Sequence, residues 1–468
     1  MTQNKPTQSV ADRSRREFLK ASALAAAGFA VGANLLWTPR VLGADKSRSV
    51  LVIGAGFSGL GAARKLTDMG YTVTVLEGRD RIGGRVWTDR TQKTPVDLGA
   101  AWIYGSDGNP ITPLAQEARA RLLATPDDSI TVHDADGDAI TAPKLKNGNS
   151  RYDGLIARVN KIITPDGPDK SFDDAIDATD SKYKHDPIVR WNLAARIELV
   201  TGAPLEHLSA KHWNDVKKFD GKDMIVPDGF DTIANALAQD LNIKLGEVVK
   251  SIDYDETDVT VQTSKGVYHA DFAVVTLPLG VLKAKSVKFN PELPDAKIDA
   301  IGRLGTGTVN KVALFFDRPF WPADTQFIGF ASGDKNPFPL FLNCKTFSEE
   351  NMLVALSGGS GGPALETHSD SKIEDDIMEV MHAMFSTNAI SPIRTVVSRW
   401  GTDRFSRGSH TYLSAHATPD DLTALAQPVG NRLFFAGEHT SVDYRGTVHG
   451  AYLSGIREAD RIHELAKT

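Results

Sequence analysis

Cysteine is almost absent from this chain of 468 residues. Cys344 is the only one, so no disulfide can form within the chain. No histidine or cysteine is near it in sequence, and we therefore expect a small buried hydrophobic residue rather than a reactive thiol. The 12 histidines are scattered and form neither an HExxH motif nor a Cys/His cluster. No metal site is expected.

The chain also lacks an excess of positive charge. The formal net charge is −6, and the first 44 residues hold six Lys/Arg and two Asp/Glu, which leaves 47 basic and 57 acidic residues, a net charge of −10, in the rest. A chain this acidic is a poor ligand for phosphate backbones, so we expect no nucleic-acid partner. Long apolar runs are also missing: the stretch from Ala21 to Leu36 is short and only moderately apolar. We expect no stable membrane insertion.

The first 44 residues have the pattern of an export signal. Residues 14–20 read SRREFLK, the Ala- and Gly-rich stretch follows, and Leu42-Gly43-Ala44 offers a small-residue cleavage site before Asp45. This pattern resembles a twin-arginine signal peptide, which implies the twin-arginine export machinery as a partner and a periplasmic location for the folded protein. A chain that folds before export need not rely on disulfides, which agrees with its single cysteine. An uncleaved N-terminal anchor is the alternative.

The next segment predicts a nucleotide-binding βαβ unit. Ser49 to Ile53 reads as a buried strand, residues 54–59 read GAGFSG, a helical pattern runs from Leu60 to Met69, and a second strand runs from Tyr71 to Leu76. Gly54 allows the tight turn, Gly56 lets the backbone approach a pyrophosphate, and Gly59 lets helix and strand pack closely. The helix N-terminus attracts the phosphates, and Glu77 can accept hydrogen bonds from ribose hydroxyls.

The residues after Glu77 favour FAD over NAD. Residues 77–85 read EGRDRIGGR, in which arginines can bind a pyrophosphate and glycines allow close backbone approach. This segment resembles the flavin-containing amine oxidases, a family of polyamine oxidases, monoamine oxidases and lysine-specific histone demethylases. Further matches follow in order at 96–110, 202–213, 270–283, 308–321 and 433–461, whereas residues 125–190 match poorly.

The resemblance implies an α/β fold in which a Rossmann-like FAD-binding domain is interleaved with an α+β substrate-binding domain. The FAD-binding domain would comprise residues 45–105, 221–303 and 428–468, and the substrate-binding domain residues 106–220 and 304–427. FAD would be bound non-covalently, because Ser409 occupies the place where monoamine oxidases carry a flavin-linking cysteine. The residues expected at the cofactor are Gly54, Gly56, Ser58, Gly59, Glu77, Gly78, Arg79, Gly84, Arg85, Gly99, Ala100, Trp102, Val248, Glu438, Thr447 and Val448.

The terminal segment has its own physical rationale. Residues 433–437 read LFFAG, a buried strand that ends in a close approach, and Glu438 follows, placed to hold the ribityl or pyrophosphate side of the cofactor. A helix then starts near Thr447-Val448. Its free N–H groups can face the pyrimidine edge of the flavin, where negative charge develops on reduction. A docked helix that only packs is the alternative.

Lys311 is the central catalytic candidate. Val309 to Phe316 reads as a strand buried on both faces apart from Asn310 and Lys311. From spacing alone, Lys311 could equally be a residue at a frayed strand end whose amine reaches solvent. The resemblance implies instead that Lys311 bonds through water to flavin N5, the atom that accepts a hydride from the carbon beside the amine nitrogen. Dioxygen would then reoxidise the flavin and give hydrogen peroxide.

Three further residues are expected near the reacting atoms. Trp400 resembles the family's tryptophan beside the flavin, although a plain core aromatic is the alternative. Two aromatic walls of monoamine oxidases fall here on His410 and Thr447, which predicts a roomier site that suits long or N-substituted amines such as polyamines. Glu198 is a candidate partner for a second amine, with a surface carboxylate as its more ordinary role.

Other functions compete with a polyamine-oxidase-like enzyme. An L-amino-acid oxidase needs a cation for the substrate carboxylate, and no residue of the sequence can be assigned to that role. A dehydrogenase would pass electrons to a periplasmic carrier instead of dioxygen. A non-catalytic FAD-holding scaffold would have no use for Lys311 and Trp400. Flavin reduction by an amine without oxygen separates the enzymes from the scaffold.

Overall fold

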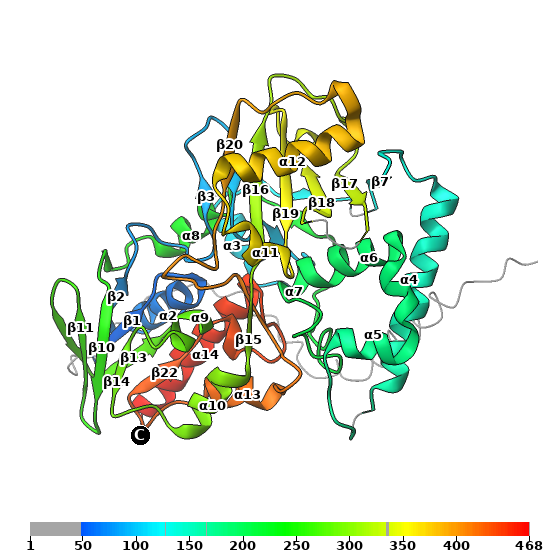
Figure 1. Ribbon diagram of the computed structural model, residues 1–468. Coiled ribbons are helices and arrows are strands. Elements are labelled where there is room, and N and C mark those ends of the chain that lie inside the picture. Colours follow the sequence, from blue (N-terminus) through cyan, green and yellow to red (C-terminus); the bar gives the residue numbers. More distant parts are fainter. Residues whose placement is uncertain (1–47, 127, 165, 334–336, 468) are drawn as a thin grey trace, which may run out of the picture. The chain divides into compact units, whose positions relative to one another are not determined.

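A parallel five-stranded sheet is assembled from three separate stretches of the chain (Figure 1). All four of its strand pairings are parallel. The computed structural model describes residues 48–467 apart from 127, 165 and 334–336, so the expected export signal at residues 1–44 lies outside the described residues. In sheet order the strands are β22 (Leu433–Phe435), β13 (Phe272–Val275), β1 (Ser49–Ile53), β2 (Thr72–Glu77) and β9 (Ile243–Leu245).

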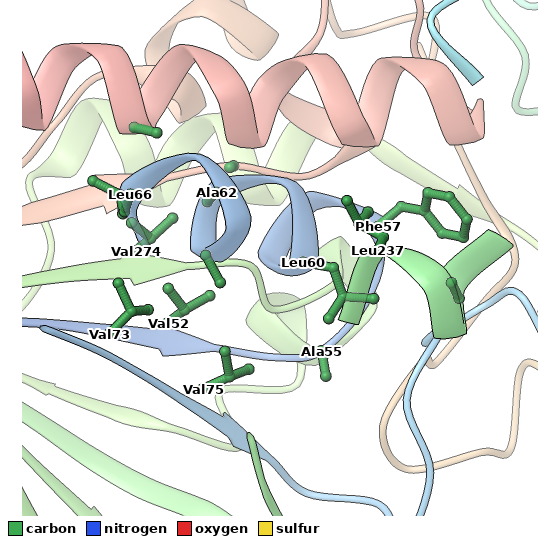
Figure 2. Close-up of a cluster of buried hydrophobic side chains, with 14 of the residues drawn as sticks. Val52, Ala55, Phe57, Leu60, Ala62, Leu66, Val73, Val75, Leu237 and Val274 are labelled. Carbon is green, nitrogen blue, oxygen red and sulfur yellow. The ribbon is translucent and has the colours of Figure 1, made fainter. Parts of the chain in front are cut away.

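Both faces of this sheet are covered, and the strand alternation shows how. Val50 and Val52 of β1 point into one apolar cluster, whereas Leu51 and Ile53 point into another. Figure 2 shows the first cluster, in which Leu60 and Leu66 of a helix pack over strand valines. The helices on that face are α2 (Phe57–Asp68), α8 (Asp231–Ala238) and α14 (Val448–Ala466).

The opposite face carries a second, smaller sheet and three helices. Its strand order is β12–β11–β10–β14, with antiparallel pairing except between β10 and β14. The strands are β10 (Val249–Tyr254), β11 (Val259–Thr263), β12 (Val267–Ala270) and β14 (Lys288–Asn290). The helices are α9 (Leu279–Lys283), α10 (Asp295–Arg303) and α13 (Pro419–Ala426).

A third sheet of six strands carries Lys311. Only the β17–β7 pairing in it is parallel. Figure 1 shows α12 (Asp370–Phe385) lying across this sheet, and methionines and isoleucines of α12 pack on Val312 and Leu314. Ala313 and Phe315 face the opposite side. In order the strands are β20 (Arg394–Val397), β16 (Asn310–Phe315), β19 (Met352–Ser357), β18 (Leu340–Asn343), β17 (Phe327–Ala331) and β7 (Ile130–Asp134).

A helical layer packs beside this sheet. Trp191 donates from its indole to the carbonyl oxygen of Pro339 next to β18, which ties the layer to the sheet. One segment, η2 (Ala194–Glu198), is a π-helix, a feature that often marks a functional site. The other elements are α4 (Ala142–Ile162), α5 (Phe172–Asp180), η1 (Ser181–His185), α6 (Pro187–Leu193) and α7 (Leu199–Thr201).

Short elements complete the described chain. They are the strands of three small sheets and several short helices that join the larger units. These are β3 (Thr88–Asp89), β4 (Val96–Asp97), β5 (Trp102–Ile103), β6 (Leu123–Ala124), β8 (Met224–Ile225), β15 (Gly305–Gly307), β21 (His410–Tyr412), α3 (Ile111–Glu117), α11 (Gly361–Leu365), η3 (Cys344–Thr346), η4 (Ser386–Asn388) and η5 (Glu438–Thr440).

The predicted fold class is confirmed: a Rossmann-like parallel sheet is combined with a separate mixed sheet and its helices. Every strand of the parallel sheet falls in the stretches expected for the FAD-binding domain, and every strand of the six-stranded sheet falls in the others. Ser47–Thr468 is nevertheless one compact unit, so the domain boundaries themselves stay a prediction. Within the described residues, every helix is too short or too polar to traverse a bilayer.

Candidate active site

A large cavity connects the first βαβ unit to the strand that carries Lys311. One end is lined by the Gly54 turn and Glu77, and the other by Lys311 and Trp400. Of the residues expected at the cofactor or the reacting atoms, those that line it are Gly54, Gly56, Ser58, Glu77, Arg79, Gly84, Arg85, Gly99, Ala100, Trp102, Lys311, Trp400, His410, Glu438, Thr447 and Val448.

The glycine turn has the geometry expected for phosphate approach. Gly54 has a φ of +107°, which favours glycine, and Gly56 is the N-cap of α2, whose first-turn N–H groups are not used within the helix. Gly59 does not line the cavity. A Cβ there would lie 1.9 Å from the carbonyl oxygen of Gly54, so Gly59 allows α2 to pack against the turn. The cavity therefore begins at a helix N-terminus suited to an anion.

Glu77 is fixed by the backbone around it. Its side chain is 6% exposed, and its two carboxylate oxygens accept from the N–H groups of Ala55 and Arg79, each at 2.8 Å. Each oxygen keeps a lone pair for a ribose hydroxyl. Gly78 does not line the cavity, and a Cβ there would meet the ring of Phe405 at 2.6 Å. Its role is packing.

Both arginines of the EGRDRIGGR segment that line the cavity already have carboxylate partners. Arg79 donates to both oxygens of Asp403, at 2.7 and 2.8 Å. Arg85 donates to Glu438 at 2.8 Å. Burial alone would raise the pKa of Glu438, but Arg85, His439 and hydrogen bonds outweigh it and hold that pKa at about 2. Glu438 is thus a permanent anion that fixes Arg85 at the cavity wall.

Lys311 is buried at the other end of the cavity. Its side chain is 8% exposed, and Nζ donates to the carbonyl oxygens of Asp97 at 2.9 Å and Gly99 at 2.7 Å. Nζ also lies 5.3 Å from the centre of the Trp102 ring. Burial lowers the pKa of Lys311 to about 8, although the charge of Asp97 raises it. The alternative of a solvent-reaching lysine at a frayed strand end is wrong.

Trp400 stands beside Lys311. It is 3% exposed, its indole N–H donates to the carbonyl oxygen of Leu98 at 3.0 Å, and its ring meets that of Trp87 edge-on with centroids 6.0 Å apart. Leu98 and Gly99 therefore hold Trp400 and Lys311, respectively, through adjacent carbonyl groups. The segment after β4 is the common anchor of both side chains.

His410, Thr447 and Val448 lie where the C-terminal helix meets the cavity. Burial lowers the pKa of His410 to about 4, so its ring is neutral at pH 7. Thr447 is the N-cap of α14 and accepts from the N–H of Gly450 at 2.9 Å. Val448 begins the helix, so the positive end of its dipole faces the cavity. The predicted helix start at Thr447-Val448 is confirmed.

Like Gly59 and Gly78, Val248 and Glu198 do not line this cavity. The N–H of Val248 donates to the hydroxyl of Ser264 and the Val248 carbonyl accepts from the Ser264 N–H, which occupies both groups just before β10 begins and just after β11 ends. Glu198 is not a surface carboxylate, because it is 5% exposed and paired with Arg190 at 2.8 Å. Glu198 lines a neighbouring cavity, and of the described residues only the adjacent Leu199 lines both.

Sequence reasoning missed Tyr104 and His449, which also line the main cavity. Tyr104 is 54% exposed and therefore marks its mouth. His449 packs edge-on against Phe219 and Tyr444. Tyr104 lies within the matched segment 96–110 and His449 within the matched segment 433–461, which was the available signal. Cys344 is buried and outside the cavity lining, and the described residues include no group of His, Cys, Asp and Glu that could hold a metal ion.

Comparison with known proteins gives consistent similarities. The profile of the flavin containing amine oxidoreductases matches residues 57–463. Polyamine oxidase 4 of Oryza sativa subsp. japonica is 35% identical over 432 residues, which cover 88% of each chain. Lysine-specific histone demethylase 1 homolog 1 of Arabidopsis thaliana is 34% identical over 444 residues, which cover 90% of this chain but 52% of that one. The solved structure of putrescine oxidase, wild type bound to putrescine, is similar in fold, with a TM-score of 0.75 at 21% identity over 89% of this chain and 99% of that chain.

Proposed function

The chain belongs to the flavin-containing amine oxidoreductases and its cofactor is FAD, and we propose that it oxidises an amine to an imine with dioxygen as electron acceptor. Water hydrolyses the imine to an aldehyde or ketone and a smaller amine or ammonia, and dioxygen is reduced to hydrogen peroxide. The single observation that carries this proposal is Lys311, buried beside Trp400 in the cavity that begins at the Gly54 turn.

The residues along the cavity fit FAD in order. Glu77 suits the adenosine ribose, the N-terminus of α2 with Arg85 suits the pyrophosphate, and the N-terminus of α14 at Thr447 suits the flavin pyrimidine edge. When bound, FAD supplies the hydride-accepting N5 atom. No cysteine lines the cavity, which supports non-covalent binding.

The protein's contribution is to hold a neutral amine next to Lys311. A nitrogen must keep its lone pair to expel a hydride from the neighbouring carbon, so the ammonium form is unreactive. Leu199, Val309 and Leu356 give the Lys311 end an apolar lining, which disfavours a charged amine. With two N–H groups bonded to Asp97 and Gly99, the ammonium form of Lys311 supplies one further N–H donor at the same place, and neutral His410 adds no competing charge.

Amines are better substrates for this cavity than amino acids. Among the described residues that line it, the cations are Arg79, Arg85 and Lys311, and both arginines are already paired with carboxylates. A substrate carboxylate would have to displace one of those pairs or bind Lys311, whose amine already donates to the carbonyl oxygens of Asp97 and Gly99. This favours an amine oxidase over an L-amino-acid oxidase.

The absence of two aromatic walls supports long or N-substituted amines as the substrate class. His410 and Thr447 stand at the positions of those walls, and Thr447 is committed to capping α14. Polyamine oxidase relatives at 34–35% identity agree with this choice. Glu198 does not contribute a free carboxylate for a second amine, because Arg190 neutralises it.

We propose a periplasmic location for the protein, on the basis of the twin-arginine pattern of residues 14–20.

The test is a panel of amines and amino acids mixed with the purified protein without oxygen, followed by air. Bleaching of the flavin absorbance by spermidine or an N-alkylamine, with peroxide released in air, is the expected result. Bleaching without peroxide would assign a dehydrogenase that uses an electron carrier. Bleaching by an L-amino acid alone would contradict the proposal. If no compound bleaches the flavin, the protein would instead be a non-catalytic FAD-holding scaffold.

A further inference from the structure

Asn310 lies directly before Lys311 on β16 but on the other face of the strand. It is 0% exposed and points away from the cavity, toward α11 and the residue that follows it, Glu366. A buried amide in a strand whose last four residues are apolar is costly unless it is fully hydrogen-bonded. Its partners therefore explain why the residue is there.

The Asn310 side chain makes four hydrogen bonds. Nδ2 donates to the carbonyl oxygen of Gly362 at 3.1 Å and to Oε1 of Glu366 at 2.8 Å. Oδ1 accepts from the hydroxyl of Ser398 at 3.2 Å and from the backbone N–H of Trp400 at 3.0 Å. A carbonyl and a carboxylate only accept and a backbone N–H only donates, so these partners fix the orientation of the amide.

Glu366 extends the same network along the chain after Trp400. Its carboxylate accepts from the backbone N–H groups of Gly401 at 2.7 Å and Thr402 at 2.6 Å. Three consecutive N–H groups, those of Trp400, Gly401 and Thr402, are thus held by the Asn310–Glu366 pair. The indole N–H of Trp400 is held from the cavity side by Leu98.

Ser398 links the network to Lys311. Its hydroxyl donates to Asn310 and accepts from the backbone N–H of Lys311 at 2.8 Å, and its own N–H donates to the Lys311 carbonyl oxygen at 2.9 Å. The backbones of both candidate catalytic residues are therefore joined through one buried amide behind the sheet. We propose that Asn310, supported by Glu366, is a positioning residue that fixes the Trp400 indole and Lys311 relative to each other at the cavity wall.

The decisive variant is Asn310→Asp. It keeps the shape of the side chain and the acceptor for Trp400, but it replaces two donors by an oxygen that faces the carboxylate of Glu366 and the carbonyl of Gly362. Repulsion should shift the turn that carries Trp400. We expect kcat to fall by about tenfold or more, because a misplacement of about 1 Å near the chemistry can cost a hundredfold. KM should change less, since the cavity mouth is untouched.

Asn343→Asp is the matched control. Asn343 is also 0% exposed, also lies in the six-stranded sheet, and also anchors a tryptophan, accepting from the indole of Trp321 at 2.8 Å while donating to the carbonyl oxygens of Pro322, Ala323 and Thr325. It does not line the cavity. The control should lose thermal stability to a similar extent while kcat stays at the wild-type value.

A spectroscopic measurement makes the test independent of turnover. Near-ultraviolet circular dichroism of the purified FAD-bound protein reports the edge-on Trp87–Trp400 pair, and a Trp400→Phe variant defines its contribution. Asn310→Asp should lose that contribution and Asn343→Asp should keep it. The kinetic measurement rests on the proposed amine oxidation, whereas this one does not, so a wild-type protein that oxidises no amine would contradict only the proposed function.

Two outcomes would overturn the inference. One is an Asn310→Asp protein with reduced stability but with the wild-type Trp400 signal and wild-type kcat, which would give Asn310 a structural role only. If that variant does not fold, Glu366→Gln serves instead, because it leaves Asn310 its acceptor and places a donor against the N–H of Thr402. The second outcome that would overturn the inference is a Glu366→Gln protein with an unchanged Trp400 signal and an unchanged kcat.

Discussion

Lys311 donates from Nζ to the main-chain oxygen of Gly99 over 2.7 Å, across 212 positions of sequence. A second donation goes to Asp97 at 2.9 Å. A neutral amine has two N–H groups and an ammonium has three, so both protonation states can make both bonds. What changes on titration is the third position of the nitrogen, which is an N–H donor below the pKa and a lone pair above it.

The first prediction concerns the pH dependence of Lys311. Since burial lowers the pKa of Lys311 to about 8, the extra donor is present below pH 8 and is lost as pH rises through it. The ratio of flavin reduction rates of wild type and Lys311→Met, measured by stopped flow from pH 6.5 to 9.5, should therefore change with a midpoint near pH 8. Taking the ratio cancels the ionisation of the substrate amine.

A second buried lysine provides the control for this experiment. Lys297 donates to the carbonyl oxygens of Ala424, Leu425 and Gln427 and does not line the cavity. The ratio of wild type to Lys297→Met should have no midpoint near pH 8. A flat ratio for Lys311→Met as well would show that Lys311 does not act through its titratable nitrogen.

The second prediction is that FAD is released intact on denaturation. Ser409 uses its hydroxyl to accept from the N–H of Val309 at 2.7 Å, and Cys344 lies outside the cavity with its pKa raised to about 12 by burial. Acid precipitation should leave the yellow colour in the supernatant, and Cys344→Ala should bind FAD as wild type does. Flavin that stays with the precipitated polypeptide would contradict non-covalent binding.

The third prediction changes substrate selectivity at His410. A Tyr at this position would restore one aromatic wall beside the amine path. The ratio of kcat/KM for benzylamine over spermidine should rise about fivefold in His410→Tyr, which corresponds to about 1 kcal/mol of aromatic contact. His416→Tyr, an exposed site outside the cavity, should leave the ratio unchanged. A wild-type enzyme that already prefers benzylamine strongly would refute this description of the pocket.

The fourth prediction concerns export. Replacing Arg15 and Arg16 by lysine removes the paired arginines and keeps the charge, so precursor should accumulate in the cytoplasm and the periplasmic fraction should lose amine oxidase activity. Arg13→Lys is the control that should mature normally. Immunoblots of the two fractions give the measurement. Normal maturation of the double variant would contradict the prediction of a twin-arginine signal peptide.

Local patterns predicted the parts of the structure that depend on local chemistry. The strand at Ser49–Ile53 has the predicted bounds, and the N-cap at Thr447 follows from a helix start that the sequence also predicts. The burial of Lys311 was predictable only through the resemblance, since spacing alone allowed a solvent-reaching side chain. Short-range geometry and family motifs thus account for most of the cavity.

Long-range contacts account for what was missed. The side chain of Asn310 forms hydrogen bonds with Gly362, Glu366, Ser398 and Trp400, which are 52 to 90 positions away in sequence. No local sequence pattern predicts such partners. Glu198 was predicted as an exposed carboxylate because its pairing with Arg190 depends on the π-helical turn between them. Val248 does not line the cavity, because both of its backbone groups bond Ser264 where β10 begins and β11 ends.

The interleaved order of the parallel sheet constrains when the cofactor can bind. β1 pairs with β13, which lies more than 200 residues later, and β13 pairs with β22, so the sheet has a high contact order and loop closure must precede its assembly. The cavity also needs Gly437, Glu438 and the start of α14. A nascent chain on the ribosome therefore has no flavin site until residues 433–451 have emerged from the exit tunnel. The complete FAD site forms only once β22 and the start of α14 have docked on the earlier strands.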